Sequence, residues 1–258
     1  TTPQLDRLLA HVERHFGALA EFTVEAGRPD TLDAQKLRML RDHPVTRISI
    51  NPQTMNDATL ARIGRAHTAK QTVEAYELAR SIGFDDINMD VIAALPGEDY
   101  AMFAHTLAEI RRLRPESLTV HTLAIKRSSR LHEEKYAQAE QDVARMVALG
   151  RQTAHDMGMR AYYLYRQKYM SGSFENVGWS RDGRDCLYNI YMMEETHTIL
   201  SLGGGGMTKV NLPDGHLTRF HNPKFPEQYI EQIDSVLAQK KEIFALLDSL
   251  DPTKQGIV

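Results

Sequence analysis

The sequence contains very little cysteine, because Cys186 is the only one among its 258 residues. One thiol cannot form an internal disulfide, which excludes a disulfide-stapled fold. It cannot supply a cysteine-ligated iron–sulfur cluster either, because such clusters take several thiolate ligands. We expect Cys186 to be a small buried side chain rather than a reactive thiol.

The sequence also lacks long apolar runs and a strong excess of charge of one sign. No run approaches the roughly 20 residues of a transmembrane helix, and the first residues do not read as a secretory signal. A formal net charge of -3 argues against a general binder of nucleic acid or anionic membranes. With 42% hydrophobic residues, the chain can bury a sizeable core. These properties predict a cytoplasmic protein that binds neither nucleic acid nor membrane.

Strand-like and helix-like segments alternate through the first two thirds of the chain. Short apolar runs predict strands, and apolar residues at helical spacing between capping signals predict helices. The predicted strands span residues 21–25, 46–51, 87–92, 118–124 and 160–165, and the longer predicted helices span residues 32–41, 68–82, 100–113 and 133–157. Repeated strand–helix units predict an α/β fold with a parallel sheet, closed or partly closed as a (β/α) barrel.

The alternation ends near Lys168, and glycines then become frequent. Gly172, Gly178, Gly183 and the run at residues 203–206 indicate irregular structure, and a helix is predicted over residues 227–247. We therefore expect two domains, a partial barrel over residues 1–168 and a C-terminal α+β subdomain over residues 169–258.

The most informative strand residue is Asp90, a carboxylate within an otherwise apolar strand. Side chains two apart on a strand share a face, so Asn88 and Asp90 point one way and Met89 points the other. In a parallel barrel, residues at the carboxyl ends of the strands meet the ligand. Polar residues recur near these ends along the chain: Glu25, Asn51, Gln53, Asp90, His121 and Lys126. The alternative for Asp90 is a structural carboxylate satisfied by an arginine or a backbone amide.

Several separated segments resemble the oxygen-independent coproporphyrinogen III oxidase family of radical SAM proteins, most closely its coproporphyrinogen dehydrogenase branch. The segments that carry the resemblance read EFTVEAGRP (21–29), RISINPQTM (47–55), LARIGR (60–65), NMDVIAALPGE (88–98) and LTVHTLAIKR (118–127). The similarity continues through residues 162–168, 189–195 and 203–209. It therefore covers nearly the whole chain, with the segments in the family's order.

The resemblance implies a set of residues that contact S-adenosylmethionine. The matching positions are Glu25, Gln53, Arg65, Asp90, the backbone near Ala124, and Met207. A carboxylate can accept from ribose hydroxyls, and an arginine can pair with the carboxylate of the ligand. The structural alternatives are a surface ion pair for Arg65 and a plain turn at residues 203–206. No catalytic residue and no protein metal ligand is assigned.

The chain departs from the family in its cluster-binding segment. Members hold a 4Fe-4S cluster on a Cys-x3-Cys-x2-Cys loop, followed by a Gly-Gly segment and a Thr-Pro like Thr2-Pro3. The sequence starts at Thr1 without a methionine and contains no such loop. We therefore expect this chain to be a cluster-free and inactive fragment of a parent protein that carries the cluster.

The resemblance implies a function for the parent protein in haem biosynthesis: oxidative decarboxylation of coproporphyrinogen III to protoporphyrinogen IX, with an electron donor as a further partner. The substrate carries four carboxylates, so Lys126, Arg127, Arg166 and Lys168 are its expected partners, with Tyr163 and Tyr165 as flat walls for pyrroles. Exposed basic residues and core tyrosines are the structural alternatives. Two other functions stay open: a haem chaperone of the same superfamily, and a non-redox barrel that binds a nucleotide-like ligand.

Overall fold

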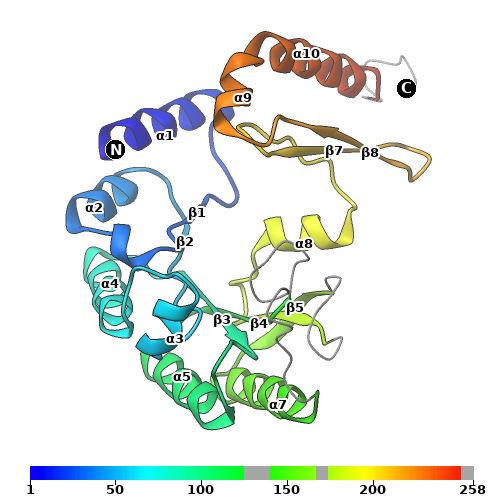
Figure 1. Cartoon of the computed structure of the whole chain (residues 1–258). Coiled ribbons are helices and arrows are strands. Elements are labelled where there is room, and N and C mark those ends of the chain that lie inside the picture. The colour runs from blue at the N-terminus through cyan, green and yellow to red at the C-terminus, as the bar shows by residue number, and fades with distance from the viewer. Residues whose placement is uncertain (125–139, 167–173, 251–258) are drawn as a thin grey trace. The chain divides into compact units, whose positions relative to one another are not determined.

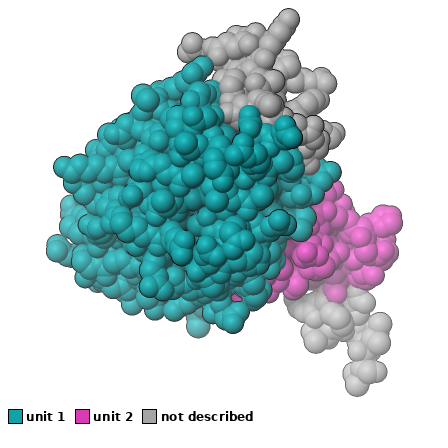
Figure 2. Space-filling view, turned by 90° about the horizontal axis from the view of Figure 1, so that it is seen from below, with its two compact units in different colours: residues 1–186 teal, residues 187–258 magenta. Residues whose placement is uncertain are grey.

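The computed structural model describes residues 1–124, 140–166 and 174–250. By their internal contacts, these residues divide into two compact units, Thr1–Cys186 and Leu187–Val258 (Figure 2). The expected domain boundary after residue 168 stays a prediction. By their internal contacts, the described residues divide after Cys186, 18 positions later. Each unit is described by itself.

A six-stranded sheet forms the centre of the first unit, with strand order β1-β2-β3-β4-β6-β5. Four neighbouring strands run parallel: β1 (Thr23–Glu25), β2 (Arg47–Ser49), β3 (Ile87–Ala93) and β4 (Ser117–Thr122). Strand β6 (Asn176–Ser180) lies between β4 and β5 (Arg160–Tyr165) and is antiparallel to both. The predicted parallel α/β sheet is confirmed over β1 to β4. The antiparallel β6 was not predicted, because its sequence lies in the glycine-containing region after residue 168.

Helices precede and follow the strands of this sheet and cover one side of it (Figure 1). They are α1 (Thr2–Phe16), η1 (Pro29–Thr31), α2 (Ala34–Asp42), α3 (Asp57–Arg62), α4 (Ala69–Ile82), α5 (Tyr100–Leu113) and α7 (Glu140–Asp156). Local sequence fixes several of their ends. The side chains of Asp33, Thr68 and Asp99 accept hydrogen bonds from the first turns of α2, α4 and α5, and Gly83 ends α4 in the left-handed conformation.

Burial alternates along β3 as the sequence predicts. Ile87, Met89 and Val91 are fully buried against the helices, whereas Asn88 and Asp90 on the opposite face are half-buried. The helix side of the sheet forms a continuous apolar core with α5 and α7, which includes Phe103, Leu107, Ile110 and Met146. The other face, called here the inner face, carries the polar side chains of β3 and is the face available to a ligand.

The second unit consists of a two-stranded antiparallel sheet and three helices. Its elements are α8 (Leu187–Glu194), β7 (Met207–Asn211), β8 (Leu217–His221), α9 (Pro226–Glu231) and α10 (Ile233–Leu250). The predicted helix over residues 227–247 is therefore observed as two helices, α9 and α10. No helix within the described ranges is long and apolar enough to cross a membrane.

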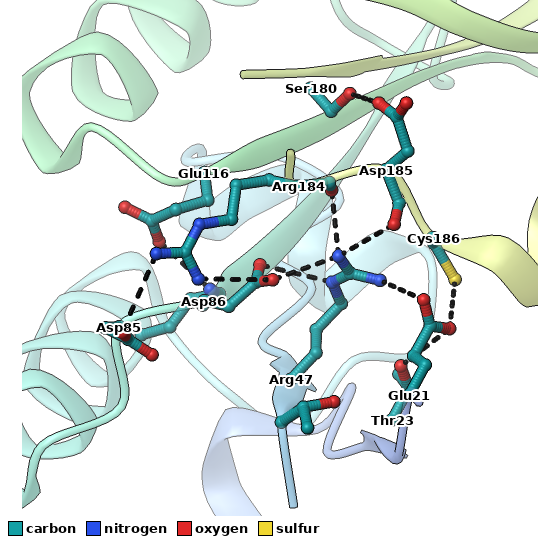
Figure 3. Close-up of polar contacts among 12 residues, drawn as sticks. Glu21, Thr23, Arg47, Asp85, Asp86, Glu116, Ser180, Arg184, Asp185 and Cys186 are labelled. Atoms are coloured by element: carbon teal, nitrogen blue, oxygen red, sulfur yellow. Dashed lines mark hydrogen bonds and ion pairs between the residues drawn. The ribbon is translucent and has the colours of Figure 1, made fainter. Parts of the chain in front are cut away.

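A buried arginine joins several segments at the amino-terminal end of the sheet (Figure 3). Arg47, the first residue of β2, donates two parallel hydrogen bonds to Asp86 at 3.1 and 3.0 Å, and one to Glu21 at 3.1 Å. It also donates to the backbone carbonyls of Arg184 and Asp185 at 2.8 and 3.2 Å. This arginine thus ties the end of the first unit to two of its central strands.

Cys186 lies beside this arginine and is buried, as its expected structural role requires. Its Sγ donates to Glu21 Oε1 at 3.3 Å. The thiol therefore lies at the amino-terminal end of the sheet, whereas the predicted ligand residues belong to the carboxyl end.

His43, the residue after α2, contacts two carboxylates of α1. His43 Nε2 lies 2.9 Å from Asp6 Oδ1, and its Nδ1 contacts Glu13 Oε1. Burial opposes the charged imidazole, but hydrogen bonds to Asp6 and Glu13 outweigh this effect and raise the pKa of His43. A histidine whose pKa rises on folding stabilises the folded state below its unfolded pKa of about 6.5, and this contribution disappears as the pH rises through the folded pKa.

We therefore expect His43→Gln to lower the free energy of unfolding at about pH 6 and to have a much smaller effect at about pH 8. Urea unfolding of the wild type and the variant at both pH values measures the difference. Equal losses at the two pH values would show that His43 acts through neutral contacts alone.

Candidate functional site

The carboxyl end of the sheet carries two acidic side chains on the inner face. Glu25 is the last residue of β1 and accepts a hydrogen bond from Ser49 Oγ of β2 at 2.9 Å. Burial of its carboxylate and the negative charge of Asp90 raise the pKa of Glu25. Glu25 pairs with Ser49 and Ser49 with Asn88, which shares its strand face with Asp90, so the sheet register brings these two predicted residues to one face.

Gln53 extends the sheet past the end of β2. Its backbone NH donates to the carbonyl of Asp90 at 2.9 Å, and its carbonyl accepts from Ile92 at 2.9 Å. Its φ is +66°, in the left-handed region that a residue with a Cβ rarely adopts. Two backbone bonds to β3 thus hold a buried glutamine in an unusual conformation beside Asp90.

A hollow of about 400 Å³ opens next to these residues. Three of the predicted contact residues line it, since Glu25, Gln53 and Arg65 belong to its wall; its other lining residues are Ala26, Gly27, Arg28, Thr31 and Asn51. The backbone of Gly27 approaches Asn51 closely, because a Cβ at this position would lie 3.0 Å from Asn51 Nδ2. Asn51 Oδ1 is buried and has no hydrogen-bond partner among the residues that the structure describes.

The rim of the hollow carries positive charge. Arg65 is half-buried in the loop after α3, and Arg28 forms an exposed ion pair with Asp30 at 2.9 Å. The hydrogen bond from Arg28 lowers the pKa of Asp30. The carboxylate of Glu25 and the guanidinium groups of Arg28 and Arg65, which all line the hollow, suit a ligand that bears both positive and negative groups.

Strands β3, β4 and β5 contribute a second polar group to the inner face. His121 of β4 places Nε2 at 3.6 Å from Asp90 Oδ2 and Nδ1 at 3.4 Å from the hydroxyl of Tyr165. Asn88 Nδ2 donates to the other oxygen of Asp90 at 2.9 Å. Two predicted site residues, Asp90 and Tyr165, are thus connected through His121, which the sequence showed as a polar strand residue without a role.

A glycine of β6 allows tyrosines of β5 to lie over the sheet. Gly178 pairs with Thr119 on one side and with Tyr163 on the other. A Cβ on Gly178 would lie only 1.8 Å from the ring of Tyr163, so this ring covers the glycine. The hydroxyl of Tyr163 reaches Thr119 Oγ1 at 3.3 Å, and burial raises the pKa of this hydroxyl. The expectation of irregular structure at Gly178 is wrong, because Gly178 lies within β6 between Val177 and Trp179.

The remaining predicted residues have separate locations. Ala124 follows the carboxyl end of β4, and Arg166 forms an ion pair with Glu175. Met207 begins β7, which belongs to the second unit and not to the unit that contains the hollow. Lys126, Arg127 and Lys168 lie outside the described residues.

The glycine run at residues 203–206 forms a turn of the second unit. Asn222 Nδ2 donates to the carbonyl of Gly203 at 2.8 Å, and the backbone NH of Asn222 donates to Gly206 at 2.9 Å. Gly203 and Gly205 have positive φ values of 90° and 72°. Residues 203–206 thus form a turn in which positive φ values favour glycine. A plain turn is the structural alternative given for this run in the sequence analysis.

The described residues do not fit an iron–sulfur cluster. Within these ranges, no group of three or more histidine, cysteine, aspartate or glutamate side chains could hold a metal ion. The single thiol of the sequence, Cys186, is hydrogen-bonded to Glu21 at the opposite end of the sheet. Cluster ligation by these residues is therefore excluded on chemical grounds.

Comparison with known proteins relates this chain and its fold to one superfamily. Residues 3–110 match the model of the Radical SAM superfamily. The oxygen-independent coproporphyrinogen-III oxidase-like protein HemZ of Bacillus subtilis is 42% identical over 247 residues, which are 93% of this chain and 49% of that protein. The heme chaperone HemW of the same organism is 36% identical over 125 residues, 47% of this chain and 33% of that protein.

Among solved structures, coproporphyrinogen III oxidase HemN of Escherichia coli, a radical SAM enzyme, shares the fold. Its TM-score is 0.68 at 19% identity, over 91% of this chain and 54% of that chain. The chain spans about half the length of HemZ and a third of the length of HemW. Residues 3–110 thus form a Radical SAM domain, the chain is homologous to HemZ over most of its length, and it shares the fold of HemN.

Proposed function

We propose that this chain provides the S-adenosylmethionine-binding face of a radical SAM enzyme that decarboxylates coproporphyrinogen III to protoporphyrinogen IX. The observation that carries the proposal is the hollow in which Glu25, Gln53 and Arg65 meet, with Asp90 close enough to affect Glu25. The 42% identity to a coproporphyrinogen oxidase-like protein supports the choice of reaction.

The chemistry of the hollow fits this cofactor. S-adenosylmethionine carries an ammonium, a carboxylate, a sulfonium and a ribose with two hydroxyls. Glu25 and Asp90 can accept from the ammonium and the hydroxyls, and Arg65 can pair with the carboxylate. Asn51 Oδ1, a buried acceptor without a described partner, is a further position at which a ligand or a water would complete the hydrogen bonding.

The bound cofactor would supply one-electron hydrogen-abstraction chemistry that no side chain provides. The chain's own residues bind and orient it: the two carboxylates favour its positive groups, and the backbone bonds of Gln53 keep the wall of the hollow in place. We propose that the tyrosines of β5 and Arg166 face the porphyrinogen, whose flat rings and carboxylates they complement.

Asp90→Asn keeps the shape of the side chain and removes its charge. We expect this change to lower the affinity for S-adenosylmethionine by roughly 1–3 kcal/mol, with the fold intact, because a charged acceptor is lost. Calorimetric titration of the protein that carries the cluster segment measures the affinity, and Asp142→Asn on the exposed side of α7 is the matched control. Unfolding of Asp90→Asn, with unchanged affinity in the folded fraction, would make Asp90 a structural carboxylate.

We propose that the cluster cysteines belong to a part of the whole protein outside residues 1–258, and that this chain alone is inactive. Anaerobic reconstitution of residues 1–258 with iron and sulfide should therefore leave the chain essentially colourless, because it has a single thiol. Absorption of a stoichiometric 4Fe-4S cluster would contradict this proposal.

A haem chaperone is the second candidate function, because residues of this chain are 36% identical to HemW. An anaerobic assay with an electron donor separates the two candidates. Conversion of coproporphyrinogen III into a product with two vinyl groups supports the decarboxylase. Stable binding of haem without that conversion supports the chaperone, and nucleotide binding without either supports a non-redox barrel.

A further inference from the structure

His121 occupies the centre of the inner face and contacts both of its halves. On one side, its Nε2 lies 3.6 Å from Asp90 Oδ2 of β3. On the other side, its Nδ1 lies 3.4 Å from the hydroxyl of Tyr165 on β5, with the two rings edge to face at a centroid distance of 6.4 Å. The imidazole thus lies between the predicted cofactor residue and the predicted substrate residue.

The sheet register explains why these residues meet. Asp90 pairs with Thr119, and His121 is two residues further along β4, so both β4 side chains share the inner face with Asp90. Strand β6 separates β4 from β5, and its Gly178 lies under the ring of Tyr163, on which Tyr165 stacks. Tyr165 reaches His121 across this intervening strand.

Both ends of this polar chain are held by further contacts. Asn88 donates to Asp90 Oδ1 at 2.9 Å, which fixes the oxygen that His121 does not contact. Tyr165 stacks on Tyr163 with an interplanar angle of 6° and a centroid distance of 6.2 Å. The imidazole of His121 is thus a side chain that contacts both Asp90 and Tyr165 directly.

The hydrogen-bonding capacity of the three groups selects one tautomer. A carboxylate only accepts, so its position 3.6 Å from Nε2 favours the tautomer with the hydrogen on Nε2. In that tautomer Nδ1 has a lone pair, which can accept the hydroxyl of Tyr165. The tautomer with its hydrogen on Nε2 therefore suits both neighbours at once.

We propose that His121 is a positioning residue that fixes the Asp90 carboxylate for the cofactor and couples it to Tyr165 on the aromatic side of the inner face. The identity of the ligand rests on the proposed function, but the bridge itself does not. Through this bridge, Tyr165 affects cofactor binding although it does not line the hollow. The two ligand regions then respond to one another through a single side chain.

A double-mutant cycle tests the coupling. The affinity of the protein that carries the cluster segment is measured for S-adenosylhomocysteine, in the wild type, Tyr165→Phe, His121→Leu and the double variant. We expect Tyr165→Phe and His121→Leu each to weaken binding roughly threefold to tenfold, and Tyr165→Phe to add nothing in the His121→Leu background. Tyr162→Phe, which removes a hydroxyl from the same strand, should not change the affinity. His121→Gln, which keeps a donor and an acceptor, should restore part of the loss.

A second measurement needs no ligand. Nitrogen NMR of the imidazoles in residues 1–258 should show His121 with its hydrogen on Nε2, and Tyr165→Phe should shift the resonance of Nδ1. The proposal is overturned if Tyr165→Phe changes the affinity equally in the wild type and in the His121→Leu background. It is also overturned if Tyr165→Phe leaves the Nδ1 resonance of His121 unchanged. If the wild type does not bind S-adenosylhomocysteine, the proposed function fails, and the Nδ1 resonance alone decides whether the bridge exists.

Discussion

Arg47→Met should destabilise the first unit by about 3–5 kcal/mol, because it leaves buried charge without a partner. Arg47 is 4% exposed, and Asp86 is 6% exposed. Five hydrogen bonds connect the guanidinium to Asp86, Glu21 and the carbonyls of Arg184 and Asp185 (Figure 3). Methionine replaces the aliphatic part of the arginine side chain but satisfies none of these acceptors.

Urea unfolding followed by circular dichroism measures this loss. Adding Asp86→Asn to Arg47→Met should recover part of the stability, because it removes the orphaned charge. The control is Arg184→Met, whose guanidinium is more exposed and only approaches Asp85 and Asp86 at 3.6 and 3.7 Å. We expect Arg184→Met to lower the free energy of unfolding by less than about 1 kcal/mol. Similar losses for both arginines would contradict a special role of the buried one.

Gly178→Ala should cost about 3 kcal/mol and displace the ring of Tyr163 from the sheet. The added methyl would lie 1.8 Å from Tyr163 Cε1, a distance that no small adjustment relieves. Moving the ring also breaks its contact with Thr119 and its stacking on Tyr165. The expected result is a lower melting temperature and a changed near-ultraviolet circular dichroism signal.

The matched background for this change is Tyr163→Ser, which removes the ring that the methyl would meet. In that background Gly178→Ala should be close to neutral, because the double variant has room for the methyl. A second control is Gly158→Ala, where no atom lies within 4 Å of the new methyl, although its φ of +75° adds some strain. If Gly178→Ala lowers the stability as much in the Tyr163→Ser background as in the wild type, then the backbone, and not the ring, requires glycine.

The parts of the site that share one strand could be predicted from the sequence. Alternation along β3 placed Asn88 and Asp90 on one face, and the burial of Met89 on the other face confirms it. The recurrence of polar residues at successive strand ends also led to Glu25 and Gln53, which the structure brings to one hollow. Parallel strand–helix units impose this convergence, because consecutive parallel strands end at the same edge.

Contacts across non-consecutive strands could not be predicted in the same way. The insertion of β6 between β4 and β5 depends on tertiary pairing, which local periodicity does not encode. The contact between Tyr165 and His121 crosses that inserted strand, and the ring of Tyr163 lies over the strand only because Gly178 has no side chain. The buried arginine cluster likewise joins residues 137 and 138 positions apart in sequence, through Arg47 and the carbonyls of Arg184 and Asp185.

The central claim is that the hollow at the carboxyl end of β1 to β3 holds S-adenosylmethionine. A crystal structure of the protein that carries the cluster segment, soaked anaerobically with S-adenosylmethionine, tests this claim directly. The account predicts ligand density in the hollow, in contact with Glu25, Gln53, Arg65 and Asp90. Density for the cofactor at another place, with this hollow filled only by water, would contradict it.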